Sequence, residues 1–306
     1  MPYPSPITYP SGLLYPGVEV PGNQGRSPIA LGDLLLNRVD EDGTVWAIES
    51  NPGWLGSPGS TAVLTQRARG HGATSSEGFL LPKTLPMTGR IRARTAEGLS
   101  LALDRLNQAV SLEPFNLVVS ESGRVRHMVV KRQDEILVST PRGSSLTAEF
   151  SLQLVATDPR KFGDLVTATT RLPFSSGGLV RPSTWPRTWT GISGTGQIII
   201  NNPGNTQAPV WLRIDGPLPA GGHSVTHQGK QQTLTFGTAM ELEAGGFLTV
   251  DMERREVLAQ GQSARSGYVT SRGWFTLDPG DNLISFSSVN YSETASLSVT
   301  TKPAWS

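Results

Sequence analysis

Residues 146–159 read LTAEFSLQLVATDP and form the clearest strand pattern in the chain. Apolar side chains occupy every second position, namely Leu146, Ala148, Phe150, Leu152, Leu154 and Ala156. Successive side chains of a strand point to opposite faces, so this alternation predicts a strand with one buried face. The strand ends at Asp158-Pro159, because a proline cannot donate a hydrogen bond to the ladder.

The composition of the whole chain extends this prediction. The 306 residues include 34 Gly and 23 Pro, spread between short apolar runs, which is typical of many turns and few helices. We therefore expect a mainly β protein. The formal net charge of +1 gives no global attraction to nucleic acid or to an anionic membrane surface. The absence of cysteine excludes disulfides, thiolate metal sites and cysteine nucleophiles.

The amino terminus shows no targeting pattern. Residues 1–17, MPYPSPITYPSGLLYPG, contain neither the basic region nor the apolar core of a signal peptide. No run in the chain approaches the ~20 apolar residues that a membrane helix needs. We expect a protein that is made soluble and does not associate with a membrane. Residues 1–30 alternate Pro and Gly with aromatic residues and are predicted to be an extended arm.

The first half of the chain carries several strand signals. Residues 34–49, LLLNRVDEDGTVWAIE, predict a hairpin because Asp42-Gly43 separates two apolar runs. Residues 89–94 predict a strand with Arg90, Arg92 and Arg94 on one face. Further strands are predicted at residues 115–119, 125–130 and 136–138.

One helix is predicted in this half. Thr95 is a suitable N-cap, Glu97 lies in the first turn where the helix dipole favours an acid, and Pro114 ends the segment. An apolar stripe follows at helical spacing and consists of Leu99, Leu103, Leu106 and Val110. We assign Leu103 on the helix and Leu152 on the strand to one shared core.

The pattern changes at residues 171–190, which are rich in proline and serine and hold two tryptophans, and which we interpret as a linker between domains. Beyond it, short apolar runs alternate with turn residues, as in a two-sheet sandwich. The predicted strands are residues 197–201, 209–215, 224–227, 233–236, 247–252, 256–259, 283–287 and 295–300.

Candidate chemistry is sparse. His223 and His227 are four residues apart, but GGHSVTHQGK predicts a strand entering a turn, where this offset separates the rings, so we expect surface or hairpin histidines. Residues 40–43 lack the oxygen spacing of a calcium loop. We therefore predict no catalytic, cofactor-binding or metal-binding residues, no cofactor and no enzyme activity. A carboxylate pair for glycoside hydrolysis stays open, because such residues meet only in space.

Aromatic and basic residues suggest contacts rather than catalysis. Trp211 and Trp274 fall in predicted strands and are assigned to packing. The tryptophans in predicted loops or termini are assigned to contacts with protein in preference to sugar, and they are Trp54, Trp185, Trp189 and Trp305. Two rows of arginines have three possible partners. We assign them with equal weight to acidic residues of a neighbouring subunit or to solvent, and with less weight to DNA. The residues are Arg90, Arg92, Arg94, Arg124, Arg126 and Arg132.

A series of segments, in their order along the chain, resembles the distal tail proteins of long-tailed bacteriophages, in the style of the minor tail proteins of actinobacterial phages. In the first half the resemblance lies in residues 45–48 (VWAI), 51–60, 69–72 (RGHG), 88–91 (TGRI) and 154–163 (LVATDPRKFG). In the second half it lies in residues 201–209 (NNPGNTQAP), 248–251 (LTVD), 254–257 (RREV), 274–286 (WFTLDPGDNLISF) and 304–305.

This resemblance implies four segments: the arm at residues 1–30, a split-barrel-like domain with one helix at residues 31–170, the linker at 171–190, and a galectin-like β-sandwich at 191–306. It implies a structural virion protein, made in the host cytoplasm, that forms a ring, expected to be a homo-hexamer, at the distal tail tip. The ring would join the tail tube protein to the tail-tip hub protein and mount receptor-binding or fibre proteins. DNA would only pass through its channel. The alternative is a carbohydrate-binding β-sandwich adhesion module, a secreted class that normally begins with a signal peptide.

Overall fold

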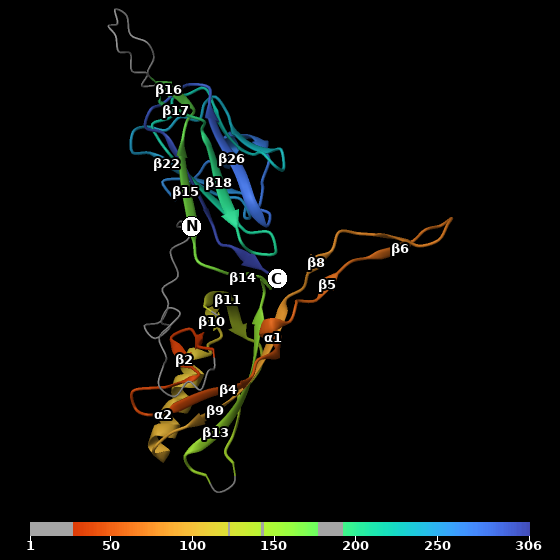
Figure 1. The fold of residues 1–306 in the computed structure, drawn as a ribbon, viewed down its shortest axis with the longest axis vertical. Coiled ribbons are helices and arrows are strands. Elements are labelled where there is room, and N and C mark those ends of the chain that lie inside the picture. The colour runs from red at the N-terminus through yellow and green to blue at the C-terminus, as the bar shows by residue number, and fades with distance from the viewer. Residues whose placement is uncertain (1–26, 122, 142–143, 177–191) are drawn as a thin grey trace, which may run out of the picture. The chain divides into compact units, whose positions relative to one another are not determined.

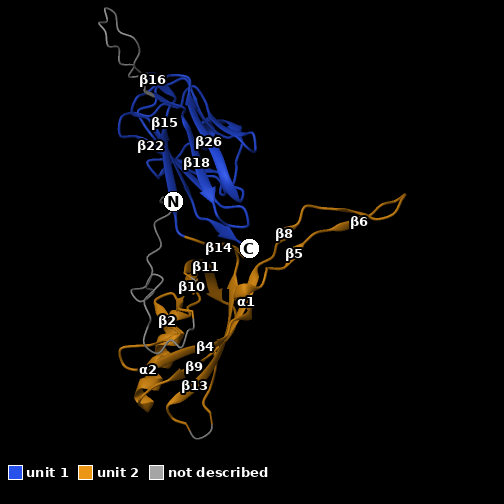
Figure 2. Ribbon diagram, viewed as in Figure 1, with its two compact units in different colours: residues 1–6, 164–305 blue, residues 7–163, 306 orange. Residues whose placement is uncertain are grey.

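The computed structural model describes residues 27–121, 123–141, 144–176 and 192–306 (Figure 1). The predicted arm therefore lies outside the described residues, apart from its last four positions. The chain forms two compact units, which divide between Gly163 and Asp164 (Figure 2). In chain order, we call residues 27–163 (orange in Figure 2, unit 2 of its key) the first unit and residues 164–305 (blue, unit 1 of its key) the second unit.

The first unit is built on a sheet that follows the strand order β2-β1-β10-β11-β13-β9-β4-β3, with β12 paired to β13 and β14 paired to β11. This path stays open, since β2 and β3 are its two ends within the described part of the chain. The strands are β1 (Ile29–Leu31), β2 (Leu34–Leu36), β3 (Arg38–Val39), β4 (Val45–Ser50), β9 (Lys83–Arg92), β10 (Phe115–Glu121), β11 (Arg124–Arg132), β12 (Leu137–Ser139), β13 (Thr147–Ala156) and β14 (Lys161–Phe162). Two two-stranded ladders, β5 (Ser60–Thr61) with β8 (Phe79–Leu80) and β6 (Leu64–Gln66) with β7 (Ala73–Ser75), form a separate hairpin.

The strand predicted from LTAEFSLQLVATDP is β13, at the centre of this sheet. It pairs with β9 over ten positions, from Thr147 opposite Arg92 to Ala156 opposite Lys83. The apolar face is buried as predicted from Ala148 to Ala156, while Leu146 precedes the strand and is 37% exposed. Alternation in sequence thus fixes which face of the strand meets the core.

The predicted helix is α2 (Ala96–Ala109). Its cap is confirmed, because the Thr95 Oγ1 accepts a hydrogen bond of 3.0 Å from the Gly98 amide. The stripe packs into the core of the first unit through Leu99, Ala102 and Leu106, with Leu103 only partly buried at its margin. A second, four-residue helix, α1 (Pro52–Leu55), begins at a proline and was not predicted.

A glycine lets two strands pack closely in this core. Gly89 of β9 lies opposite Phe150 of β13, and a Cβ at position 89 would meet the Phe150 ring at 2.5 Å and the Ala47 carbonyl oxygen at 2.7 Å. A side chain there would displace the ring, so we interpret Gly89 as the position that admits Phe150.

The second unit is the predicted sandwich of two antiparallel sheets, with strand orders β15-β27-β19-β22-β23-β24 and β18-β26-β20-β21-β25, together with the pair β16-β17. Its strands are β15 (Val166–Arg171), β16 (Phe174–Ser176), β17 (Ile192–Gly194), β18 (Gln197–Asn202), β19 (Val210–Asp215), β20 (His223–His227), β21 (Gln232–Phe236), β22 (Phe247–Asp251), β23 (Glu256–Ala259), β24 (Ser263–Ala264), β25 (Val269–Arg272), β26 (Gly280–Ser288), β27 (Ser296–Thr301) and β28 (Ala304–Trp305), with a short 3-10 helix at Ser266–Tyr268. All eight strands predicted for this half are present, with ends shifted by a few residues at most. The inward face of β19 is fully buried through Val210, Leu212 and Ile214.

The division between the units differs from the predicted boundaries. β15 pairs along its whole length with β27, from Val166 opposite Thr301 to Arg171 opposite Ser296, so it belongs to the sandwich. Residues 174–176 of the predicted linker form β16, which pairs with β17, and residues 177–190 lie outside the described residues. The strand β15 carries threonines rather than large apolar residues, so it has no alternation of apolar and polar residues that would predict a strand.

Candidate assembly and binding surfaces

A long hairpin leaves the first unit between α1 and β9. Its outgoing and returning segments run antiparallel in the ladders β5-β8 and β6-β7 (Figure 1). The amide of Leu81 donates to the Gly59 carbonyl at 2.8 Å. Every residue from 59 to 82 is exposed. We call this segment, residues 59–82, the hairpin arm. Its sequence is rich in turn residues, and its apolar positions are few and irregular, so no local pattern predicts the two ladders.

The hairpin arm exposes large apolar side chains on a structure that has no core. Its exposed apolar residues are Val63 (65%), Leu64 (70%), Phe79 (62%), Leu80 (43%) and Leu81 (44%). An isolated two-stranded hairpin is marginally stable at best in water. Clustered exposed apolar residues mark interaction surfaces more often than single ones do. The arm is therefore the strongest candidate in the first unit for contact with another protein.

The row of arginines on β9 is exposed, as predicted, but its pairing is within the chain. The Arg90 guanidinium lies 2.8 Å from a Glu149 carboxylate oxygen on β13 and 3.3 Å from Glu49 on β4. All three side chains are about half exposed, so each pair adds only ~0.2–1 kcal/mol to stability. The sequence could not reveal this cross-strand triad, because the strand order β4-β9-β13 is not readable from the chain.

The predicted hairpin turn at residues 40–43 is held by Asp40. Its carboxylate accepts hydrogen bonds from the amides of Asp42 and Thr44 at 3.1 and 3.0 Å, and from the Trp46 indole at 3.2 Å. Arg105 of α2 also pairs with Asp40, at 3.2 Å, and with Asp42, at 2.8 Å. Asp40 therefore caps the hairpin turn, and Asp40 and Asp42 together bind the turn to helix α2 through Arg105.

The two histidines of β20 lie in the hairpin that β20 forms with β21, as predicted, but they are buried, so the expectation of a surface position is wrong. His223 and His227 are each 3% exposed and point to the inner face of the sandwich. The His223 ring stacks on Phe236 with centroids 4.5 Å apart, and the His227 ring meets the edge of Phe275 at 5.3 Å. A strand places residues 223, 225 and 227 on one face, and here that face is the core. Among the residues that the structure describes, no three His, Cys, Asp or Glu side chains gather as a metal site would require.

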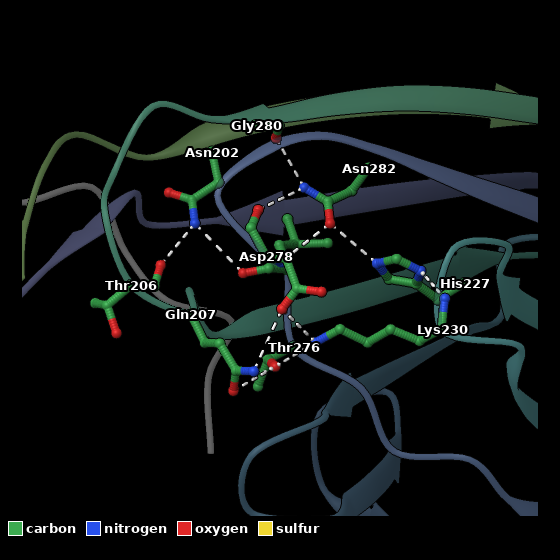
Figure 3. A network of polar contacts seen from close by, with 10 residues as sticks. Asn202, Thr206, Gln207, His227, Lys230, Thr276, Asp278, Gly280 and Asn282 are labelled. Carbon is green, nitrogen blue, oxygen red and sulfur yellow. Dashed lines mark hydrogen bonds and ion pairs between the residues drawn. The ribbon is translucent and has the colours of Figure 1, made fainter. Parts of the chain in front are cut away.

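His227 belongs to a polar network that ties the sheet to its connecting loops (Figure 3). The Lys230 amide donates to its Nδ1 at 3.2 Å, so Nε2 carries the proton and donates to the Asn282 Oδ1 at 3.0 Å. The Asn282 amide group donates in turn to the carbonyls of Asp278, at 2.8 Å, and Gly280, at 2.9 Å. Both ring nitrogens thus have partners, which fix the orientation of the ring.

The neighbouring Asn202 organises the same end of the sandwich. Its Nδ2 donates to the carbonyls of Thr206, at 2.9 Å, and Leu277, at 3.3 Å. Its Oδ1 accepts from the amides of Gly204, at 3.0 Å, and Ala304, at 3.4 Å. Asn202 is fully buried, so these four contacts replace the water that its amide loses.

His223 differs from His227 because neither of its ring nitrogens has a hydrogen-bond partner, although both are buried. Burial lowers its pKa from 6.5 to about 4. Between these two pH values, His223 binds a proton in the unfolded chain but not in the folded chain. The free energy of unfolding therefore falls as the pH falls from 6.5 to 4. At its full extent this loss is on the order of 3 kcal/mol.

We expect a His223→Leu variant to lose this acid sensitivity. Thermal melts at pH 7 and pH 4.5 should show a larger drop in Tm for the parent than for the variant. His71→Leu, at an exposed histidine of the hairpin arm, is the matched control and should behave as the parent does. Equal drops for parent and His223→Leu would contradict the assignment.

The tryptophans divide differently from the prediction. Trp54 lies in α1, is 2% exposed and packs in the core of the first unit, so it is no contact residue. Trp211 is on β19 as predicted, but it is only partly buried, and its indole donates to Asp251 at 3.1 Å. Trp274 follows β25 rather than lying in a strand, and Trp305 is in β28. Trp185 and Trp189 lie outside the described residues.

A pocket of about 620 Å³ opens at the end of the sandwich where β20 begins. Its lining comes from the start of β20, the end of β21 with the turn after it, the segment 267–270 and the end of β26. The residues are Gly221, Gly222, His223, Ser224, Thr235, Phe236, Gly237, Thr238, Ala239, Gly267, Tyr268, Thr270, Ser287, Ser288 and Val289. We call it the His223 pocket. Its position had no sequence signal, because its walls come from four separate segments.

In the part of the chain that the structure describes, no helix has the length and apolar character needed to cross a membrane.

Comparison with known proteins identifies the second unit. Residues 204–305 match the family model described as siphovirus-type tail component, C-terminal domain. No curated protein matches the sequence closely enough to count as a relative.

A solved structure shows the fold over most of the chain. The crystal structure of the Dit protein (gp 19.1) of phage SPP1 is similar with a TM-score of 0.58 and 12% identity, over 83% of this chain and 91% of that one. It is described as a paradigm of the hub adsorption apparatus in phages that infect Gram-positive bacteria. Chains of the phage p2 baseplate in its activated conformation, with calcium or with strontium, match with TM-scores of 0.45 and 0.44 at 11% identity, over 90% of this chain and 97% of those. The match to the family model and the fold agree with the resemblance drawn from the sequence: residues 204–305 are similar to the carboxyl-terminal domain of the siphovirus-type tail components, and over most of its length the chain has the fold of the SPP1 Dit protein.

Proposed function

We propose that this chain is a distal tail protein whose copies form a ring at the end of a phage tail. The ring joins the tail tube protein to the tail-tip hub protein, and its sandwich domains mount receptor-binding or fibre proteins. The role is structural and needs no catalytic residue. A homo-hexamer is the copy number that we propose, and DNA passes through the channel without specific contacts.

The observation that carries this proposal is the hairpin arm. It exposes five large apolar side chains on a two-stranded ladder that cannot bury them itself. In a ring, each copy of the chain has a second copy as its neighbour. If each hairpin arm contacts the next copy head to tail, the closed ring covers the arm of every copy. The description of the family as a tail component supports the same setting.

The division of the chain into two units supports the proposal that one part forms the ring and the other mounts partner proteins. Each unit has its own buried core, and the sandwich is complete within residues 164–305. We propose that it is a separately folding domain that starts near Asp164. A separate domain can carry a partner protein without disturbing the ring, since few of its stabilising contacts depend on ring formation.

We expect removal of the apolar side chains of the arm to abolish assembly. The variant replaces Val63, Leu64, Phe79 and Leu80 together by serine, and it should sediment as a monomer where the parent sediments as a ring. No core is touched, so its Tm should stay within a few degrees of the parent value. Analytical ultracentrifugation and negative-stain microscopy measure the two outcomes.

A matched control replaces two apolar residues of similar exposure elsewhere, Leu112 (71%) and Ile199 (64%), by serine and should leave assembly unchanged. In infected cells, antibody to a tagged parent should mark the tail tip of every virion, and the arm variant should be missing there. Label along the tube or on the capsid would refute the location. A ring built equally well by the arm variant would refute the role of the arm.

A further inference from the structure

The His223 pocket is uncharged, which narrows what it can bind. Its fifteen lining residues include no Asp, Glu, Lys or Arg. A charged ligand would lose its hydration there without gaining a counter-charge. Sugar sites usually add amide or carboxylate side chains that bind pairs of hydroxyls, and this lining has none. The walls instead combine aromatic carbon, from Phe236 and Tyr268, with small hydroxyl-bearing residues.

The pocket holds a polar group that has no partner. Both nitrogens of the His223 ring are buried without a hydrogen bond, and the ring lines the pocket. Because these nitrogens are covered by the surrounding protein atoms, the lining offers a ligand no charge and no free ring nitrogen. The occupant is therefore expected to be largely apolar.

The rim of the pocket is preformed. The Gly237 amide donates to the Tyr268 carbonyl at 2.7 Å, and the Gly221 amide donates to Thr238 at 2.9 Å. On the other side the Val289 amide donates to Gly222 at 3.1 Å. Backbone contacts of this kind hold the opening in shape, so binding requires little ordering of the rim.

Exposed apolar residues gather beside this opening. Tyr268 (38%) and Val289 (77%) line it, and Tyr291 (55%) follows two residues later in the same loop as Val289. In the described part of the second unit, only Val166 and Ile199 are further large apolar residues exposed to a similar degree. This concentration at one rim favours a protein segment with an aromatic anchor over a small polar ligand.

The chain itself contains such a segment. Residues 1–18, which precede the described part of the chain, contain no Asp, Glu, Lys or Arg and hold three Tyr-Pro pairs, at Tyr3, Tyr9 and Tyr15. The chain has five tyrosines, and the other two are Tyr268 and Tyr291 beside the pocket. Proline-rich segments favour the polyproline II conformation and bind grooves lined by aromatic rings at low entropic cost.

We propose that a Tyr-Pro pair of the amino-terminal arm docks in the His223 pocket. The tyrosine ring lies among Phe236, Tyr268 and Val289 of the lining.

The test uses the full chain with Tyr3, Tyr9 and Tyr15 replaced by alanine, so that its own arm leaves the pocket free. A fluorescent peptide of residues 1–18 should then bind saturably, as fluorescence anisotropy reports. A peptide with the same three tyrosines replaced by alanine should bind at least about tenfold more weakly, a loss of ~1.4 kcal/mol.

A second chain variant blocks the pocket. Gly267 lines the pocket, and a Cβ there meets no atom within 4 Å, so Gly267→Phe places a ring at the opening without strain. It should abolish peptide binding, while Gln262→Phe, at an exposed position of the same unit outside the lining, should retain it. The proposal fails if no saturable binding occurs up to about 1 mM peptide. It also fails if the blocked chain or the alanine peptide binds as well as its parent.

Discussion

Replacing Leu152 by alanine should lower the free energy of unfolding of the first unit by about 3–5 kcal/mol. Leu152 is 1% exposed at the centre of β13, opposite Met87 of β9, and belongs to the core that α2 covers. Leucine-to-alanine changes at such sites lose the transfer free energy of the side chain and leave a cavity. The strand β9 pairs with β13 along its whole length and holds the backbone in place, so the cavity collapses little and the cost lies near the upper limit.

The comparison is Leu103→Ala on α2, which the sequence assigned to the same core. Leu103 is only partly buried, so its removal should cost about half as much. Chemical denaturation followed by circular dichroism gives both values. If the two variants were equally stable, the ranking of these core positions would be wrong. If the Leu152→Ala variant had the same free energy of unfolding as its parent, the assignment of Leu152 on β13 to the core would be wrong.

Replacing Asn202 by alanine should destabilise the second unit by about 3–5 kcal/mol. The change removes four hydrogen bonds at a fully buried site and leaves the amide of Gly204 without its partner. Each buried group without a partner costs ~1–3 kcal/mol. Water cannot easily replace the side chain, since Gly204 packs so closely on Ala304 that a Cβ at position 204 would lie 1.8 Å from the carbonyl oxygen.

Asn201 supplies the adjacent control. It is exposed and makes a single side-chain contact of 2.6 Å to Asp281. Asn201→Ala should therefore cost less than about 1 kcal/mol. Calorimetry of the two variants separates the effects, because the melting of the sandwich should move for Asn202→Ala and stay in place for Asn201→Ala. A reversed order would show that the buried network does not stabilise this end of the sheet.

Local patterns in the sequence predicted most of the fold. The alternation in β13, the cap at Thr95 and the Asp42-Gly43 turn each depend on neighbours within a few residues, and each is present in the structure. The eight predicted strands of the sandwich were found for the same reason. Short-range physics decides such elements before the chain is folded.

Features decided by distant partners were missed. His223 and His227 look like hairpin residues in sequence, and only the packing of β20 against the other sheet buries them. Trp54 sits among turn residues, yet α1 places it in the core. The hairpin arm and the His223 pocket have no local signature, because one depends on an absence of covering structure and the other joins four segments.

The pairing of β15 with β27 sets the order in which this protein can mature on the ribosome. β15 ends at Arg171 and its partner begins at Ser296, 125 residues later (296 minus 171), which at ~5–20 residues per second takes roughly 6–25 s to synthesise. During that interval the first unit can fold, whereas β15 emerges with its hydrogen-bonding edge open. Its threonines stay solvated, so the unpaired strand is less prone to aggregate during this interval than a run of valines would be. Nonsense mutations near the carboxyl terminus should consequently leave a folded first unit attached to an unfinished, chaperone-bound sandwich.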